Sequence, residues 1–251
     1  MSLLNHPTGG YRVLPGIAPY SRGVVSAEGF EIVHVTLERP LPETEGFARI
    51  REHLAQEGRP VTAVCGIELR SPRPFSFDGF AAFNASYAAV LNEWGVFVGD
   101  VNPVARTNVA PEVEAPESPS FYGFSYTRAC ERSLPPTFVV AGAGELPEGI
   151  LEESAIVRRG ETDADAIAEK ARFVMDLMEE RLRGLGVGWD GVTAADVYTV
   201  HPAVELLPDV ILKRMGAAAI HGVRWFYSRP PIVGIEYEMD VRGVRSEIRL
   251  G

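Results

Sequence analysis

The stretch Tyr20-Ser21-Arg22-Gly23-Val24 decides the fold, because a version of it returns as Tyr126-Thr127-Arg128-Ala129-Cys130. Each copy leads through a β-type run to a Glu-x-Pro sequence, and the Tyr-to-Glu spacing is 18 residues in the first copy and 19 in the second. The offset of 106 residues between the copies is too long for a solenoid repeat of roughly 20 to 50 residues. The repeat therefore predicts a duplicated domain, whose two unlike halves would share any active site.

The composition of the chain excludes several classes of protein. With 251 residues, 24 Lys and Arg, 34 Asp and Glu and a net charge of −10, the chain lacks the clustered basic surface that nucleic acid binding needs. It contains no run of about 20 apolar residues that would span a membrane, and its N-terminus does not resemble a signal peptide. We therefore expect a cytoplasmic protein with no membrane contact. Cys65 and Cys130 lie in apolar, β-like stretches and are expected to be reduced.

The periodicity of the first half, residues 1–118, predicts strands and helices in alternation. Residues 22–27 and 30–37 are expected to pair as a hairpin, and Phe80 and the apolar residues after it keep helical spacing behind Asp78, the expected helix cap. The other expected elements are a helix over 44–57, strands over 61–69 and 104–109, and a Pro- and Glu-rich linker over 111–120.

The second half, residues 119–251, repeats this order. The expected elements are extended runs near 122–130 and 137–143, a helix starting near Asp163, a strand over 192–200, a helix from Pro208 to about Ile220, and strands over 223–227 and 232–241. The predicted unit is β-β-α-β-α-β-β, found twice. This pattern indicates an α+β protein, in which the helices of each half pack on one face of a mixed sheet.

The last expected strand carries the most chemistry. Its period of two places Ile235, Tyr237 and Met239 on one face and Glu236, Glu238 and Asp240 on the other. The acidic face either is exposed to water or lines a cleft, where burial would raise the pKa of one carboxyl group toward that of a general acid or base. Arg224, twelve residues before Glu236, would lie on a neighbouring strand and would either reach the same pocket or form a structural salt bridge.

Six motifs, in the same order, resemble those of the reactive intermediate deaminase (RidA/YjgF) family. The first is Gly16-Ile17-Ala18-Pro19-Tyr20-Ser21, which looks like that family's N-terminal Gly-Pro-Tyr-Ser signature. The others are the helix around Asn84, Ala105-Arg106-Thr107, the turn Ala143-Gly144-Glu145-Leu146-Pro147, Val223-Arg224-Trp225, and Ile235-Glu236-Tyr237-Glu238. The resemblance covers most of residues 16–242 and implies two tandem domains of the RidA-like, chorismate mutase-like fold.

The resemblance also implies roles for individual residues. Arg224 is similar to the arginine that binds the substrate carboxylate, a task that suits a planar, permanently charged group, and Glu236 is similar to the glutamate that directs water to an imine carbon. The positions that resemble pocket-lining residues of the family are Tyr20, Tyr126, Gly144 and Asn84. The implied reaction hydrolyses an enamine or imine to a 2-oxo acid and ammonia, and it requires no metal and no organic cofactor.

The two halves depart from the family pattern in different ways. The first half keeps Tyr20, Asn84 and Arg106 but has no glutamate matching Glu236, and the second half has no clear match for Asn84. We therefore expect a degenerate first domain and a composite site. Family sites form between neighbouring domains of a trimeric ring, so three chains of two domains each would make a homotrimer.

The leading hypothesis is a deaminase resembling the two-domain 2-aminomuconate and 2-amino-5-chloromuconate deaminases. Arg106 or Arg229 would then meet the second carboxylate of the substrate. Three alternatives stay open: a general 2-imino acid hydrolase, a non-catalytic ligand-binding or regulatory protein, and a chorismatase-like enzyme.

Overall fold

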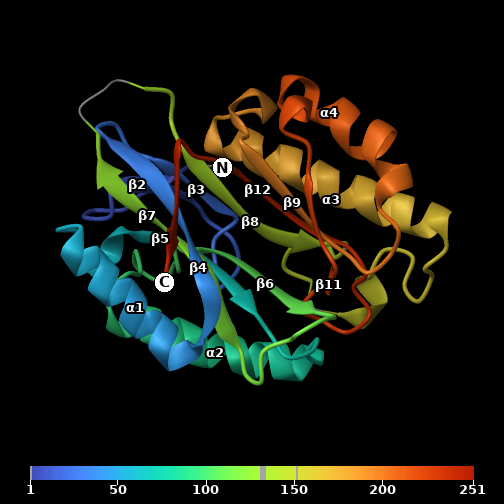
Figure 1. Ribbon diagram of the computed structural model, residues 1–251, viewed down its shortest axis with the longest axis horizontal. Coiled ribbons are helices and arrows are strands. Elements are labelled where there is room, and N and C mark those ends of the chain that lie inside the picture. The colour runs from blue at the N-terminus through green and yellow to red at the C-terminus, as the bar shows by residue number, and fades with distance from the viewer. Residues whose placement is uncertain (1, 131–133, 151) are drawn as a thin grey trace.

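Two β-sheets lie face to face in the computed structural model, which describes residues 2–130, 134–150 and 152–251. Helices α1 (Glu43–Gln56) and α2 (Phe77–Glu93) cover one outer face, and α3 (Ala164–Leu185) and α4 (Lys213–Met215) cover the other (Figure 1). The layers therefore follow the order helix, sheet, sheet, helix. Because both sheets contain parallel and antiparallel pairs, the predicted α+β class with mixed sheets is confirmed.

The first sheet has six strands in the order β11-β6-β5-β7-β4-β13. Their bounds are β4 Phe30–Pro42, β5 Val64–Arg70, β6 Ala105–Pro111, β7 Ser120–Ala129, β11 Ser228–Arg229 and β13 Ser246–Leu250. Three of its inner strands, β4, β5 and β6, come from the first half of the sequence, and the fourth, β7, begins the second half. The two edge strands, β11 and β13, come from the last 24 residues of the chain.

The second sheet has seven strands in the order β1-β2-β3-β8-β12-β9-β10. Their bounds are β1 Leu4–Asn5, β2 Tyr11–Leu14, β3 Gly23–Ser26, β8 Phe138–Gly144, β9 Ala194–Tyr198, β10 Arg224–Phe226 and β12 Glu238–Gly243. The order β8-β12-β9-β10 matches the order β4-β7-β5-β6 of the first sheet. In both sets the first two neighbouring pairs are antiparallel and the last pair is parallel.

The predicted hairpin of residues 22–27 with 30–37 is wrong. Strand β3 pairs with β2 and β8 in the second sheet, whereas β4 pairs with β7 and β13 in the first. Strands β7 and β8 are separated between the sheets in the same way. These strands are largely apolar and mostly buried, and strands buried on both faces have no alternation that would identify their partners. Each sheet therefore takes strands from both halves of the sequence.

The helix boundaries follow local capping chemistry. The helix predicted to start near Asp163 is confirmed as α3, and Asp163 caps it by accepting a hydrogen bond from the Ala166 N–H at 3.0 Å. Helix α2 is capped by Ser76, which accepts from the Gly79 N–H at 3.1 Å, and not by the predicted Asp78. Asp78 lies in the first turn instead, where a negative charge is favourable.

The helix predicted from Pro208 to about Ile220 forms only as short pieces. A π-helical turn, Leu207–Leu212, leads into α4, and a 3-10 turn, Gly216–His221, follows. Gly216 ends α4 with φ 57° and ψ −123°, a combination outside the helical region that glycine adopts without a steric penalty.

A buried layer of charged and hydroxyl side chains joins the two sheets. Thr107 on β6 donates to Asp240 on β12, with Oγ1 and Oδ2 2.6 Å apart. Arg242 Nη1 lies 3.1 Å from Asp196 Oδ2 and 3.6 Å from Glu68 Oε1, which belongs to the opposite sheet. The interpretation of the acidic face of β12 as exposed to water is therefore wrong, because the first sheet covers it.

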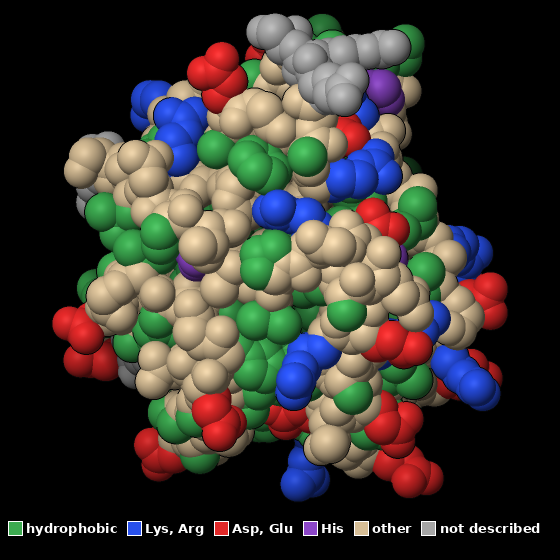
Figure 2. All heavy atoms as spheres, turned by 90° about the vertical axis from the view of Figure 1, so that its left-hand side faces the viewer, with side chains coloured by type: hydrophobic (Ala, Val, Ile, Leu, Met, Phe, Trp, Pro, Cys, Tyr) green, Lys and Arg blue, Asp and Glu red, His purple; other side chains and the backbone are tan. Residues whose placement is uncertain are grey.

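The surface differs from this interior. On the face that Figure 2 shows, acidic and basic side chains are interspersed around smaller apolar areas. Among the described residues, no helix is long and apolar enough to cross a membrane.

Asp240 is expected to make the stability of the protein depend on pH. Burial, helped by the charges of Asp196 and Glu68, raises the pKa of Asp240 from 3.8 to about 8. The folded state therefore keeps a proton that the unfolded chain releases, so stability falls as pH rises from about 4 to about 8, by at most about 1.4 kcal/mol per pH unit for one such group. Between pH 5 and pH 8, the free energy of unfolding measured with urea should fall less in Asp240→Asn than in the wild type.

The control for this experiment is Asp100→Asn, which changes an exposed aspartate in a turn and should keep the wild-type dependence on pH. Equal pH dependence in the wild type and Asp240→Asn would contradict the assignment.

Candidate active site

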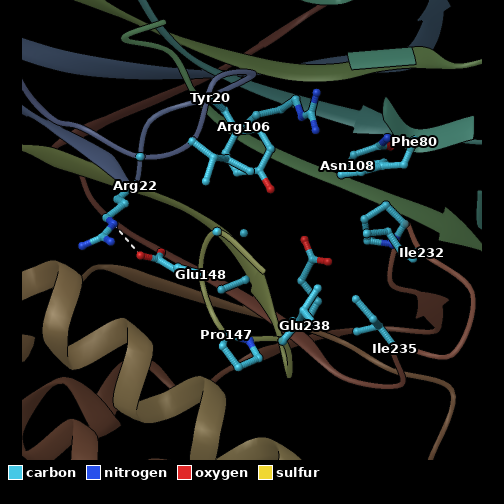
Figure 3. Close-up of a pocket in the computed structure, with 18 of the residues that line it drawn as sticks. Tyr20, Arg22, Phe80, Arg106, Asn108, Pro147, Glu148, Ile232, Ile235 and Glu238 are labelled. Atoms are coloured by element: carbon cyan, nitrogen blue, oxygen red, sulfur yellow. Dashed lines mark ion pairs between the residues drawn. The ribbon is translucent and has the colours of Figure 1, made fainter. Parts of the chain in front are cut away.

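A cavity opens between the two sheets and is lined by both halves of the sequence (Figure 3). Its walls come from the loop before β3, from α2 and β6, from β8 and the turn after it, from α3, and from the segment that ends in β12. The polar side chains that line it are Tyr20, Ser21, Arg22, Arg106, Asn108, Glu148, Arg181 and Glu238. The cavity therefore brings together three arginines and two carboxyl groups.

Glu238 supplies the buried carboxyl group of the cavity. Its side chain points toward the Tyr20 hydroxyl (Figure 3), and only 4% of the residue is exposed. Burial raises the pKa of Glu238 well above its usual range; the Asp240 carboxyl group adds to this effect, and Arg106 and Arg181 oppose it. Gly142 on β8 leaves room for this side chain, because an added Cβ would collide with Glu238 Oε1. These surroundings favour the protonated form of Glu238.

Arg106 is a buried cation held among aromatic rings. Its Cζ lies 4.6 Å from the ring centroid of Tyr20, 5.0 Å from that of Tyr87 and 5.3 Å from that of Phe80. Ring faces attract a guanidinium group, but they accept no strong hydrogen bond from it. Among the described residues, Arg106 Nη1 has no hydrogen-bond partner. Because an unpaired buried charge is costly, this guanidinium is suited to bind an anion.

Two further polar groups of the cavity wall also lack partners within the described part of the chain. Asn108 accepts a hydrogen bond from the Ser71 hydroxyl at 2.9 Å, but its Nδ2 has no acceptor. The hydroxyl of Ser21 is buried without a partner as well. Together with Arg106, these groups offer three kinds of donor to an oxygen-bearing ligand.

Glu148 and two arginines form a second charged group on another wall. Arg22 and Arg181 both pair with Glu148, and Figure 3 marks the pair made by Arg22. Arg181 reaches the cavity from α3 and also donates to the carbonyl oxygen of Ala141 at 2.7 Å. One carboxylate is thus shared by two guanidinium groups.

Only some of the residues that were predicted for the site from the sequence line the cavity. Tyr20, Arg106 and Gly144 line the cavity. Asn84 is buried on α2 without contributing to the lining, and Tyr126 packs beside His53 under α1, with ring centroids 5.0 Å apart. Although Tyr20 and Tyr126 occupy equivalent places in the repeat, they have different surroundings.

Arg224 and Glu236 do not line this cavity. Arg224 makes a two-pronged contact with Asp196, with both N–O distances 2.6 Å. Glu236 Oε2 accepts a hydrogen bond from His201 Nε2 at 2.9 Å and lies 3.7 Å from Arg229 Nη1. The structure therefore does not bring the predicted carboxylate-binding arginine and the predicted water-directing glutamate together.

Sequence reasoning missed Glu238 and Asn108 as site residues, although a signal existed for both. Glu238 shares the acidic face predicted for Glu236, and Asn108 shares the face of Arg106 two residues earlier on β6. Arg181 and Glu148 had no such signal, because their meeting depends on how α3 packs against the turn after β8.

A buried ion pair holds the segment that carries Glu238. Lys170 Nζ donates to Glu145 Oε1 at 3.0 Å, and both side chains are fully buried. The Glu145 carboxylate also accepts the backbone N–H groups of Glu236 at 2.7 Å and Tyr237 at 3.0 Å. These bonds anchor the chain just before β12 and so fix where Glu238 enters the cavity.

The site has the groups for acid–base chemistry on an anionic substrate. A buried carboxyl group favoured in its protonated form can donate a proton and then accept one, and the unpaired donor of Arg106 is available to an anion. Within the described residues, no group of three or more His, Cys, Asp or Glu side chains is arranged to hold a metal ion.

Comparison with known proteins gives two matches along nearly the whole chain. The model of a family described as "2-aminomuconate deaminase CnbZ" matches residues 3–248. The 2-amino-5-chloromuconate deaminase of Comamonas testosteroni is 42% identical over 242 residues, which are 95% of this chain and 95% of that protein.

Solved structures are more distant. A chorismatase crystal structure has 13% sequence identity and a TM-score of 0.48, covering 97% of this chain and 80% of the other. A putative endoribonuclease from Thermotoga maritima has 18% identity and a TM-score of 0.32, covering 55% of this chain and 92% of the other. At these TM-scores neither likeness defines the fold or the activity of this chain.

Removing Lys170 is expected to destabilise the protein strongly. Lys170→Met leaves the buried Glu145 carboxylate without its cation, and breaking such a pair costs about 3–5 kcal/mol. The double variant Lys170→Met/Glu145→Gln should lose less, because no unpaired buried charge remains, although the amide oxygen replaces only one of the two carboxylate oxygens that accept backbone N–H groups. Urea unfolding at pH 7.5 measures both, and Lys213→Met, at an exposed lysine of α4, is the matched control. A loss below about 1 kcal/mol in Lys170→Met would show that the pair does not hold this segment.

Proposed function

The chain belongs to the 2-aminomuconate deaminase CnbZ family, and from this premise we propose that it hydrolyses 2-aminomuconate or a close analogue to the 2-oxo acid and ammonia. The observation that carries the proposal is the pairing of Glu238 and Arg106 in one cavity, one a buried carboxyl group and the other a buried guanidinium with a free donor. This combination fits a substrate that is both anionic and activated by protonation.

Binding begins at the carboxylate next to the amino group. Arg106 supplies the positive charge, and Asn108 Nδ2 and the Ser21 hydroxyl supply further donors. The conjugated carbon chain then lies against the apolar side chains of the cavity, among them Phe80, Ile232 and Ile235. In this low-dielectric site a charge-assisted hydrogen bond is stronger than it is in water.

Glu238 would carry the proton transfers. The protonated carboxyl group donates to carbon of the enamine, which becomes an iminium ion, and the resulting carboxylate takes a proton from the attacking water. Glu238 then protonates the nitrogen of the carbinolamine; the C–N bond breaks, ammonia leaves, and the carboxylate recovers the hydroxyl proton as the carbonyl forms. One water is consumed, and Glu238 ends protonated as it began. The Tyr20 hydroxyl, which points toward Glu238 (Figure 3), would orient the water or the nitrogen.

We also propose that the chain is a two-domain relative of the RidA/YjgF family. The matching strand orders of the two sheets, β4-β7-β5-β6 and β8-β12-β9-β10, support it. In this proposal β7 closes the first domain as β12 closes the second, so the boundary lies in the segment between β7 and β8, later than the predicted 118/119. The homotrimer implied by the resemblance stays part of this proposal.

The roles of the two glutamates are separated by a pair of matched variants. Ammonia release from 2-aminomuconate should fall about 100- to 10,000-fold in kcat for Glu238→Gln, the usual contribution of a general acid–base. Glu236→Gln should stay within about tenfold of the wild type, because its side chain contacts His201 outside the cavity. The reverse result would return the catalytic role to Glu236. Binding of the substrate without ammonia release by the wild type would instead support a non-catalytic ligand-binding protein.

A further inference from the structure

Two arginines approach the proposed reaction centre from different elements of the fold. Arg106 comes from β6 of the first sheet, and Arg181 comes from α3, which packs on the second sheet. The charges of both arginines act on Tyr20 and on Glu238. The proton-transferring groups therefore lie within the field of two separate cations.

The charges that line the cavity leave it positive. Arg22, Arg106 and Arg181 carry three positive charges, Glu148 carries one negative charge, and the surroundings of Glu238 favour its neutral form. The balance is two positive charges in a protein whose net charge is −10. Buried charges require compensation, and a substrate with two carboxylates supplies it.

The side chain of Arg181 is held in place before any ligand arrives. It is 5% exposed, donates through Nε and Nη2 to Glu148, and donates through Nη1 to the carbonyl oxygens of Ala141 and Gly142. These bonds use four of the five N–H groups of a guanidinium. The fifth, on Nη2, is left to a ligand, and a preformed donor loses little entropy on binding.

We propose that Arg181, assisted by Arg22, binds the distal carboxylate of the substrate and restricts the enzyme to unsaturated dicarboxylic acids. This inference rests on the proposed function, in which Arg106 holds the carboxylate beside the reacting carbon. Glu148 pairs with both arginines and so fixes their positions. Its negative charge leaves the three groups with a net charge of about +1, which one distal carboxylate neutralises.

The test compares two substrates that differ only at the distal end. These are 2-aminomuconate and 2-aminohexa-2,4-dienoate, in which a methyl group replaces the distal carboxylate. The wild type should favour the dicarboxylate by about 10- to 100-fold in kcat/KM, the value of a charge-assisted contact. Arg181→Gln should reduce this ratio to below about threefold. The control variant Arg183→Gln changes an exposed arginine two residues further along α3, on a different side of the helix, and should keep the wild-type ratio.

Each outcome separates this inference from the proposed function. Equal turnover of both substrates by the wild type, or an unchanged ratio in Arg181→Gln, would overturn the role of Arg181 and leave the deaminase activity standing. Ammonia release from neither substrate would contradict the proposed function itself.

A binding measurement on the wild type covers the case in which Arg181→Gln does not fold. Hexa-2,4-dienedioate and hexa-2,4-dienoate have no amino group and do not react, so calorimetry at pH 7.5 gives their affinities directly. The dicarboxylate should bind about 10- to 100-fold more tightly. Equal affinities would overturn the inference.

Discussion

The hydrogen bond from Thr107 to Asp240, with the adjacent contacts of Arg242 to Asp196 and Glu68, holds the two sheets face to face. Most paired sheets meet through apolar side chains, whereas here part of the contact is a layer of charged groups removed from water. Glu238 stands on the same face of β12, two residues before Asp240. The carboxyl group proposed for catalysis is thus an extension of the layer that joins the sheets, and its environment is set by the same packing.

The free-energy cost of burying charged groups helps to locate the functional site. Buried ions elsewhere are paired, as Arg242 is with Asp196 in this layer and Lys170 is with Glu145 beneath α3. In the cavity, by contrast, Arg106 keeps a free donor and Glu238 is surrounded so that its neutral form is favoured. Unsatisfied polar groups destabilise a folded protein, so the meeting of Arg106, Asn108 and Ser21 in one cavity is the physical sign of a ligand that completes them.

The sequence allowed part of this arrangement to be predicted. The period of two along residues 235–241 placed three carboxyl groups on one face; in β12 Glu238 and Asp240 do lie opposite Met239 and Val241, whereas Glu236 precedes the strand. It did not show which of them enters a cavity, because that depends on where the strand begins and on the sheet that covers it. Arg224 was predicted beside Glu236, but Asp196, on the strand paired with β10, takes its guanidinium group. The repeat likewise equated Tyr20 with Tyr126. The two tyrosines have different surroundings, because the strands of each half are shared between the two sheets.

The proposed chemistry requires Glu238 to be protonated in its cavity at the pH at which the enzyme works. Infrared difference spectra of wild type against Glu238→Gln, recorded at pH 7.5, test it directly, because a protonated carboxyl group and a carboxylate absorb in separate bands. The wild type should show a carboxylic acid C=O band that the variant lacks. A carboxylate band in its place would contradict the assignment of Glu238 as the proton donor.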